Sequence, residues 1–83
     1  MSRDERGWMR VFFVREPGGG LRAAFAIDGR TYATSADVKR DFDEAFDELE
    51  RRRIPAEYET RPVAPTEPAS DLPTWADYRR TLG

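Results

Sequence analysis

Residues 8–29 read WMRVFFVREPGGGLRAAFAIDG, and this stretch decides the expected fold. Its first part, residues 8–15, is aromatic and β-branched and precedes a proline and three glycines, which predicts a strand followed by a turn. In residues 21–27 the larger apolar side chains recur at every second position and so share one face, which predicts a second strand. Asp28-Gly29 is the favoured pair for a two-residue hairpin turn, so residues 30–33 are predicted to form a short third strand.

An amphipathic helix is predicted to follow, at about residues 35–53. Thr34 and Asp37 have the spacing of a capping box, and Ile54-Pro55 stops further winding. Apolar residues recur at helical spacing on one stripe; they are Val38, Phe42, Ala45, Phe46 and Leu49. We expect this stripe to meet Phe25 and Ile27 of the second strand and to form the core with them.

The predicted fold is therefore α+β, with a three-stranded antiparallel meander sheet packed on one amphipathic helix in the order βββα over residues 1–54. Residues 55–73 are predicted to be a proline-rich extended linker, because five of the six prolines lie there. Residues 74–83 are predicted to form a short C-terminal helix, since Thr74 and Asp77 repeat the capping-box spacing.

The composition excludes several classes of site. The 83 residues include no cysteine and no histidine, which excludes disulfides and thiolate metal sites and removes the commonest general base. We therefore expect no enzymatic activity, no cofactor and no metal. Residues 1–7 lack the layout of a signal peptide, and no apolar run reaches membrane-spanning length, so a cytoplasmic location without membrane contact is expected.

The first strand is apolar on both faces, although only one face can meet the helix. Trp8, Phe12 and Val14 lie on one face, and Met9, Val11 and Phe13 lie on the other. The face left over would be an exposed apolar patch, and such patches usually mark contacts. Either the tail folds back and covers this face with Trp75 and Tyr78, or a partner or a second copy of the chain covers it.

The C-terminal helix is the preferred binding element. Trp75, Tyr78 and Leu82 share one face of this helix, and aromatic anchors on a helix suit docking into a groove. Together with Trp8 and Phe12 of the first strand, they are the predicted partner-binding residues. The predicted function is that of an accessory subunit, an adaptor or an inhibitor that binds a larger protein or self-associates through the apolar sheet face.

An acidic face on the long helix is a second candidate surface; it includes Asp41, Glu44, Asp47 and Glu48. The simpler interpretation is a solvated face with ion pairs inside the helix. The alternative is a surface that binds a basic groove in place of nucleic acid, as small phage-encoded inhibitors of nucleic-acid enzymes do.

Three strands followed by a helix, over residues 8–53, resemble in architecture the arm-type DNA-binding domains of phage integrases, which read the major groove through their sheet. The resemblance implies that Arg10, Arg22 and Arg30 on the strands contact phosphates or bases. Because the formal net charge is -2, nucleic acid is the second choice of partner and a protein is the first.

Overall fold

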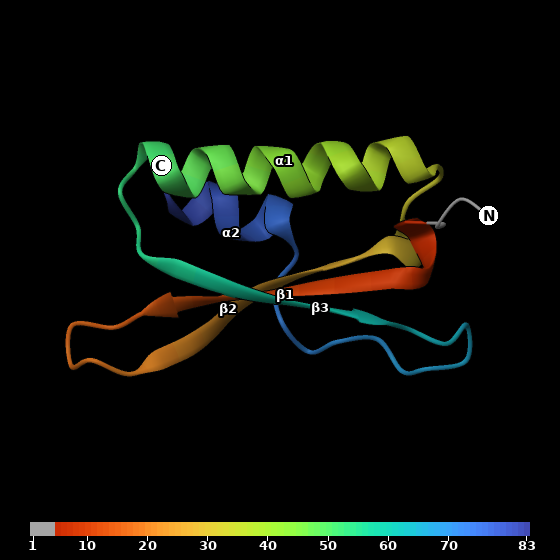
Figure 1. The fold of residues 1–83 in the computed structure, drawn as a ribbon, viewed down its shortest axis with the longest axis horizontal. Coiled ribbons are helices and arrows are strands. Elements are labelled where there is room, and N and C mark those ends of the chain that lie inside the picture. The colour runs from red at the N-terminus through yellow and green to blue at the C-terminus, as the bar shows by residue number, and fades with distance from the viewer. Residues whose placement is uncertain (1–4) are drawn as a thin grey trace.

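The structure is a computed structural model that describes residues 5–83. Residues 1–4, part of the N-terminal segment considered above for a leader sequence, lie outside the described residues. The elements in chain order are a 3-10 turn η1 (Glu5–Gly7), β1 (Trp8–Arg15), β2 (Leu21–Asp28), a 3-10 turn η2 (Gly29–Thr31), α1 (Ser35–Arg51), β3 (Ala56–Pro62) and α2 (Trp75–Thr81). One antiparallel sheet and two helices on one of its faces confirm the α+β class (Figure 1).

The hairpin of β1 and β2 follows from its turn chemistry. The two strands pair antiparallel, with Phe12 opposite Phe25 and a shift of register after Phe12. Gly19 lies in the turn with a φ of 96°, where a side chain would be strained, and its N–H donates to the carbonyl of Glu16 at 2.9 Å. The hairpin therefore brings two large rings to the same face of the sheet.

The third strand lies at a different place in the chain from the predicted one. Residues 29–31 form η2 instead, because the Asp28 carboxylate accepts a hydrogen bond from the Arg30 backbone N–H at 2.9 Å and caps this turn. The third strand is β3, which lies within the predicted linker and pairs with β1 along its whole length. The sheet order is thus β2-β1-β3, with β1 in the centre. A proline at either end of β3 is compatible with an edge strand, although it lowered the strand signal in the sequence.

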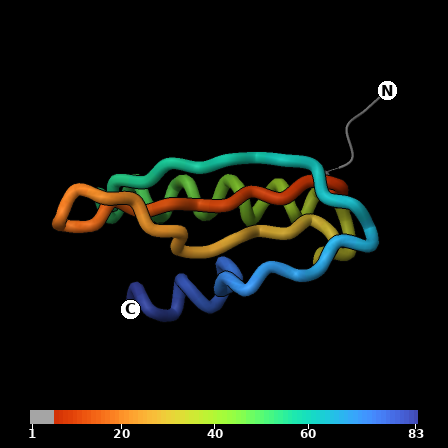
Figure 2. Tube along the Cα trace, turned by 90° about the horizontal axis from the view of Figure 1, so that it is seen from below, coloured from red at the N-terminus to blue at the C-terminus, as the bar shows by residue number. Residues whose placement is uncertain are grey.

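The helix α1 begins at the predicted cap. The Thr34 hydroxyl accepts from the backbone N–H of Asp37 at 3.1 Å. Val38, Phe42, Ala45 and Leu49 are buried against the sheet, where Phe12 and Phe25 stack with ring centroids 4.6 Å apart. Figure 2 shows α2 beside β2, at the opposite edge of the sheet from β3. The helix-facing side of the sheet is therefore covered by both helices, with α2 nearer β2.

The tail wraps around the β2 edge of the sheet. Residues 63–73 cross the outer face, the face turned away from α1, where Val63 and Leu72 pack against Met9 and Ala26. At the edge, the Ala26 N–H donates to the carbonyl of Pro73 at 3.0 Å, and the chain then enters α2 on the other face. The extended part of the tail thus contributes the apolar cover of the outer face, and α2 packs on the opposite face.

Arg30 binds this tail to the end of β2 by hydrogen bonds. Its guanidinium forms an ion pair with Asp28 at 2.6 Å and donates to the carbonyls of Ala64 and Glu67 at 2.7 and 2.6 Å. The hydrogen bond from Arg30 holds the pKa of Asp28 below its usual range.

Replacing Arg30 by glutamine is expected to return the pKa of Asp28 toward its ordinary value. A carboxyl whose folded pKa is lowered stabilises the fold above its unfolded pKa of about 3.9, and this stabilisation is lost as the pH falls through the folded pKa. The stability of the Arg30→Gln variant should therefore depend less on pH below about 4 than that of the parent. An NMR titration of the Asp28 carboxyl, with urea unfolding at pH 3 and 6, measures both effects. Arg22→Gln is the matched control, and an unshifted Asp28 in Arg30→Gln would contradict the assignment.

Candidate functional site

The predicted partner-binding residues lie mostly inside the fold. Trp75 and Phe12 are only 2% and 1% exposed, and Trp75 and Tyr78 contact the ring of Phe25 at 5.1 and 4.8 Å between centroids. Trp8, Tyr78 and Leu82 are partly buried. A helix as short as α2 needs packing to persist, and the ring of Phe25 supplies it. The aromatic face of α2 therefore packs against its own sheet.

Most of the predicted acidic face is engaged within the chain. The Tyr32 hydroxyl donates to Asp41 at 2.6 Å, and Arg79 of α2 pairs with Glu44. Arg52 donates to Glu48 at 2.6 Å, and this hydrogen bond lowers the pKa of Glu48. Asp41 thus holds the segment before α1, Glu44 holds α2 and Glu48 holds the end of α1, whereas Asp47 is exposed.

The three predicted nucleic-acid contacts do not form one basic surface. Arg10 lies under α1, with its guanidinium carbon 4.2 Å from the ring centroid of Phe42 and its Nε donating to the Thr60 hydroxyl at 3.0 Å. Arg22 pairs with Glu16 at 3.1 Å near the β1–β2 turn, and Arg30 fastens the tail. The architecture thus directs each arginine to a separate intramolecular partner.

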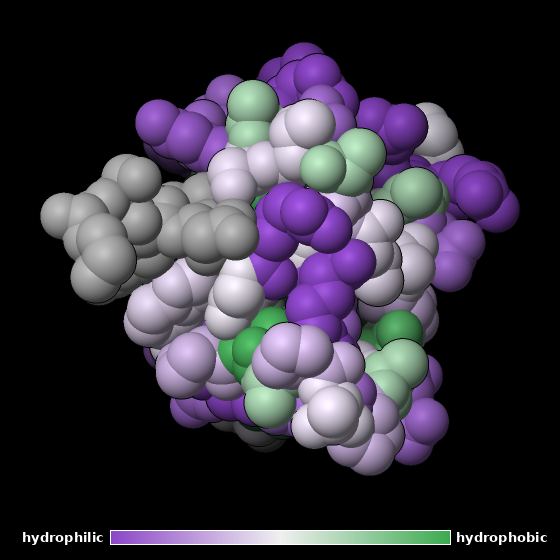
Figure 3. All heavy atoms as spheres, turned by 90° about the vertical axis from the view of Figure 1, so that its right-hand side faces the viewer, coloured by the Kyte–Doolittle hydropathy of each residue, from purple (hydrophilic) through white to green (hydrophobic). Residues whose placement is uncertain are grey.

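Hydrophilic side chains gather at the end of the molecule near η1 (Figure 3). A hollow of about 330 Å³ lies there, lined by Arg6, Gly7, Arg30, Val63 and Pro65. Of the three predicted nucleic-acid contacts, it includes only Arg30. Because the guanidinium of Arg30 already donates to Asp28 and to tail carbonyls, it has a structural role there.

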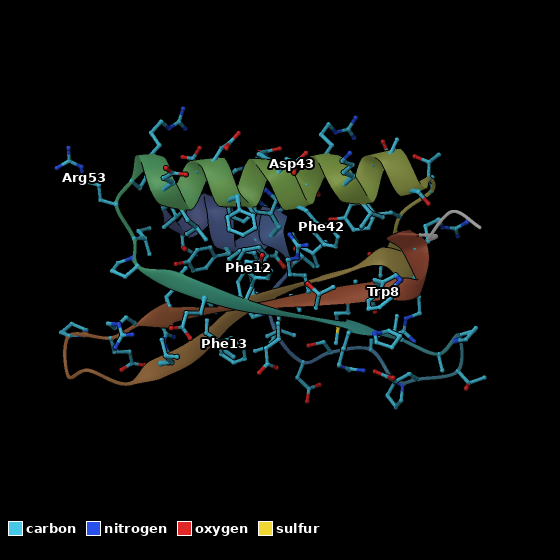
Figure 4. The ribbon with its side chains drawn as sticks, viewed as in Figure 1. Trp8, Phe12, Phe13, Phe42, Asp43 and Arg53 are labelled. Atoms are coloured by element: carbon cyan, nitrogen blue, oxygen red, sulfur yellow. The ribbon has the colours of Figure 1, made fainter. Side chains whose placement is uncertain are left out.

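A second hollow is a groove between α1 and β3, which we call the α1–β3 groove. It encloses about 250 Å³ and is lined by Phe12, Phe46, Leu49, Glu50, Ile54, Ala56, Glu57 and Tyr58. Phe46 and Tyr58 remain 38% and 45% exposed although their rings meet edge to face at 4.8 Å. Figure 4 shows Phe12 between α1 and the sheet, at the base of this region, and Phe13 on the outer face.

Phe46 was predicted to belong to the core, and its exposure corrects that assignment. It lies at the margin of the apolar stripe of α1, on the side toward β3, and its ring meets Tyr58. Within the described part of the chain no second helix covers this side, because α2 packs on β2. The groove was not among the predicted sites, since its other wall is a strand that was assigned to a linker. The alternation of residues 56–60 around Tyr58 was the signal that could have found it.

The free edge of β3 borders the groove. All seven residues of β3 are exposed. The carbonyl of Pro55 accepts from the Arg15 N–H at 3.1 Å and the N–H of Val63 donates to the Gly7 carbonyl at 2.9 Å, so the odd-numbered residues of β3 point their backbone groups toward β1. The N–H groups of residues 56, 58 and 60 therefore point outward from the sheet.

The charged residues that line the α1–β3 groove are both acidic. Glu57 lies 3.8 Å from Arg15, whereas Glu50 forms no ion pair with any of the residues 5–83. Glu59 of β3 likewise has no ionic partner within the described chain. The surroundings of the groove combine exposed rings, outward backbone groups and two carboxylates, Glu50 and Glu59, that form no ion pair among residues 5–83. Beneath the rings, the guanidinium carbon of Arg10 lies 4.5 Å from the ring centroid of Tyr58.

The structure contains neither a metal cluster nor a membrane span in its described part. Across residues 5–83, no three acidic, histidine or cysteine side chains come together as ligands. Nor does that part of the chain include a helix with the length and apolarity needed to cross a bilayer. Comparison of the chain with models of protein families, with curated proteins and with solved structures finds no match.

Proposed function

We propose that this chain is a non-catalytic protein-binding module, an accessory subunit, adaptor or inhibitor, that binds a larger protein through the α1–β3 groove and the edge of β3. The proposal moves the binding surface from α2 and the β1 rings to the opposite side of α1. The observation that supports it most is the difference between the two edges of the sheet. The tail and α2 cover the β2 edge, whereas no other segment of residues 5–83 pairs with the outer edge of β3.

A bare edge strand beside exposed rings favours a protein partner. Unprotected edges are templates for pairing with another chain, and folded proteins usually cover or block them. Rings in a groove are common anchors at protein interfaces, because they bury a large rigid area at a low cost in side-chain entropy. Phe46 and Tyr58 have both the position and the exposure for this role.

Replacing Tyr58 by alanine is expected to abolish retention of the partner with little loss of stability. Truncation of an interface anchor costs about 2 kcal/mol of binding free energy, which corresponds to roughly 30-fold in affinity. The immobilised parent chain and the Tyr58→Ala variant should be compared for retention of proteins from the native cell, with thermal melting of each. Phe46→Ala should behave in the same way.

The matched control is Leu21→Ala. Leu21 is 46% exposed, as Tyr58 is 45% exposed, and it lies near the β1–β2 turn outside the groove lining. A protein retained by the parent and by Leu21→Ala, and lost with Tyr58→Ala, supports the proposal. Equal retention of every bound protein by the parent and by both groove variants would refute it.

A further inference from the structure

We infer that the occupant of this surface is an extended, basic segment of a partner protein, which adds to the sheet as a fourth strand beside β3. The inference rests on the proposed function and adds the conformation and the charge of the bound segment.

The backbone of β3 supports binding of an extended segment. Ala56, Tyr58 and Thr60 direct their N–H and C=O groups away from β1. An extended chain about 4.8 Å away satisfies such groups by main-chain hydrogen bonds, whatever its side chains are. Pro62 has no N–H, so the binding edge ends there and spans residues 56–60.

The side chains near β3 favour one large apolar group on the bound segment. Alternate residues of an added strand face the helix side of the sheet, where Tyr58 and Phe46 meet at 4.8 Å. The α1–β3 groove, at about 250 Å³ and with apolar residues as most of its lining, offers room for such a side chain. The bound segment would then form main-chain hydrogen bonds with β3 and bury one apolar side chain in the α1–β3 groove.

The carboxylates favour a basic segment. Glu50 lines the groove on the helix side, and Glu57 and Glu59 lie opposite Phe13 and Val11 on the other face. Glu57 is already paired with Arg15 at 3.8 Å, but Glu50 on one face and Glu59 on the other form no ion pair among residues 5–83. An added strand would therefore meet one unpaired carboxylate on each of its faces. Lysine or arginine at these positions forms new ion pairs, whereas aspartate or glutamate is repelled.

The same carboxylates disfavour a second copy of this chain. Antiparallel pairing of two β3 strands about a two-fold axis with Tyr58 opposite its copy sets Glu57 opposite Glu59, and a shift of one residue pair sets Glu59 opposite its copy. The next register sets Glu59 opposite Arg61. That arginine is already paired with Glu67 at 2.6 Å, and Pro62 then replaces a donor opposite Tyr58.

The experiment is selection of random nine-residue peptides on the full-length chain, followed by binding measurements with the consensus peptide. We expect enrichment of one large apolar residue with lysine or arginine two positions away, and slower amide exchange at Tyr58 and Thr60 on binding. Thr60→Pro and Thr60→Ala form a matched pair, because both lose the hydroxyl that accepts from Arg10 and only the proline loses the outward N–H. Thr60→Pro should weaken binding about threefold to tenfold relative to Thr60→Ala.

Two charge-reversal variants test separately whether the bound segment is basic. Glu50→Lys should weaken binding of the basic peptide in low salt, whereas Asp47→Lys, the same change at an exposed position of α1 outside the groove lining, should leave it unchanged. Enriched peptides that are acidic or indifferent to Glu50→Lys, yet lost with Tyr58→Ala, would overturn the inference and leave the proposed function standing. Peptides bound equally by Tyr58→Ala would count against both. A dimer in sedimentation that Tyr58→Ala dissociates would make a second copy the occupant and overturn the inference.

Discussion

Replacement of Phe25 by alanine is expected to lower the free energy of unfolding by about 3 to 5 kcal/mol, as truncation of a buried aromatic ring does. Phe25 is fully buried and touches Phe12, Tyr78 and Trp75 at ring-centroid distances of 4.6, 4.8 and 5.1 Å. Its loss therefore leaves a cavity between the sheet and α2. Domains of this size are stable by only about 5 to 15 kcal/mol, so the variant should lose a large fraction of the parent's stability.

Urea unfolding followed by far-ultraviolet circular dichroism measures this loss, with Phe25→Leu and Phe46→Ala as comparisons. Phe25→Leu keeps most of the apolar volume and should cost less than the alanine change. Phe46 is partly exposed, so Phe46→Ala should cost only about 1 kcal/mol, in keeping with the smaller area it buries. Equal unfolding midpoints for Phe25→Ala and Phe46→Ala would contradict the core described above.

Replacement of Trp75 by alanine is expected to destabilise the protein by about 3 kcal/mol and to lower the melting temperature by on the order of 10 to 20 °C. Trp75 begins α2, is almost completely buried and joins this helix to Phe25. The adjoining bond between Ala26 and Pro73 closes the β2 edge. We therefore expect faster amide exchange in α2 and at Ala26 in addition to the lower melting temperature.

Trp75→Phe is the matched control for this change. The indole Nε1 of Trp75 is buried and has no hydrogen-bond partner among residues 5–83, so phenylalanine removes an unpaired donor while retaining an aromatic ring. Its cost should be clearly smaller than that of alanine. A melting temperature unchanged in Trp75→Ala would mean that docking of α2 contributes nothing to stability.

Local patterns predicted the elements that depend on neighbouring residues. The β1–β2 hairpin follows from alternation and glycines, and α1 and α2 begin at Thr34 and Thr74, whose hydroxyls accept the expected capping bonds. These features require only a few consecutive residues. The α+β class and the first two antiparallel strands were predictable for the same reason, whereas the third strand was predicted at residues 30–33 and lies at residues 56–62.

The elements that depend on distant residues were not predictable in the same way. Asp28-Gly29 is a strong hairpin pair, but the Asp28 carboxylate accepts from the Arg30 backbone N–H and caps a 3-10 turn, and the Arg30 guanidinium binds the tail. Residues 56–62 look like a linker because prolines bound them, and only pairing with β1 makes them a strand. Since the candidate binding groove lies between this strand and α1, the site could not be predicted without the strand. The burial of Trp75 likewise depends on Phe25, fifty residues earlier in the sequence.

The central position of β1 also bears on the order in which the sheet assembles. β1 meets β2 across a short turn, whereas it meets β3 only after α1 has brought the chain back. Closing the short loop costs less chain entropy than closing the long one, so the β1–β2 hairpin can form early and β3 joins later. β3, which joins the sheet last, is then also the edge strand that pairs with β1 alone. In the folded molecule, detachment of β3 should accordingly cost less free energy than detachment of the other strands. A segment bound along its free edge would stabilise β3 in the sheet.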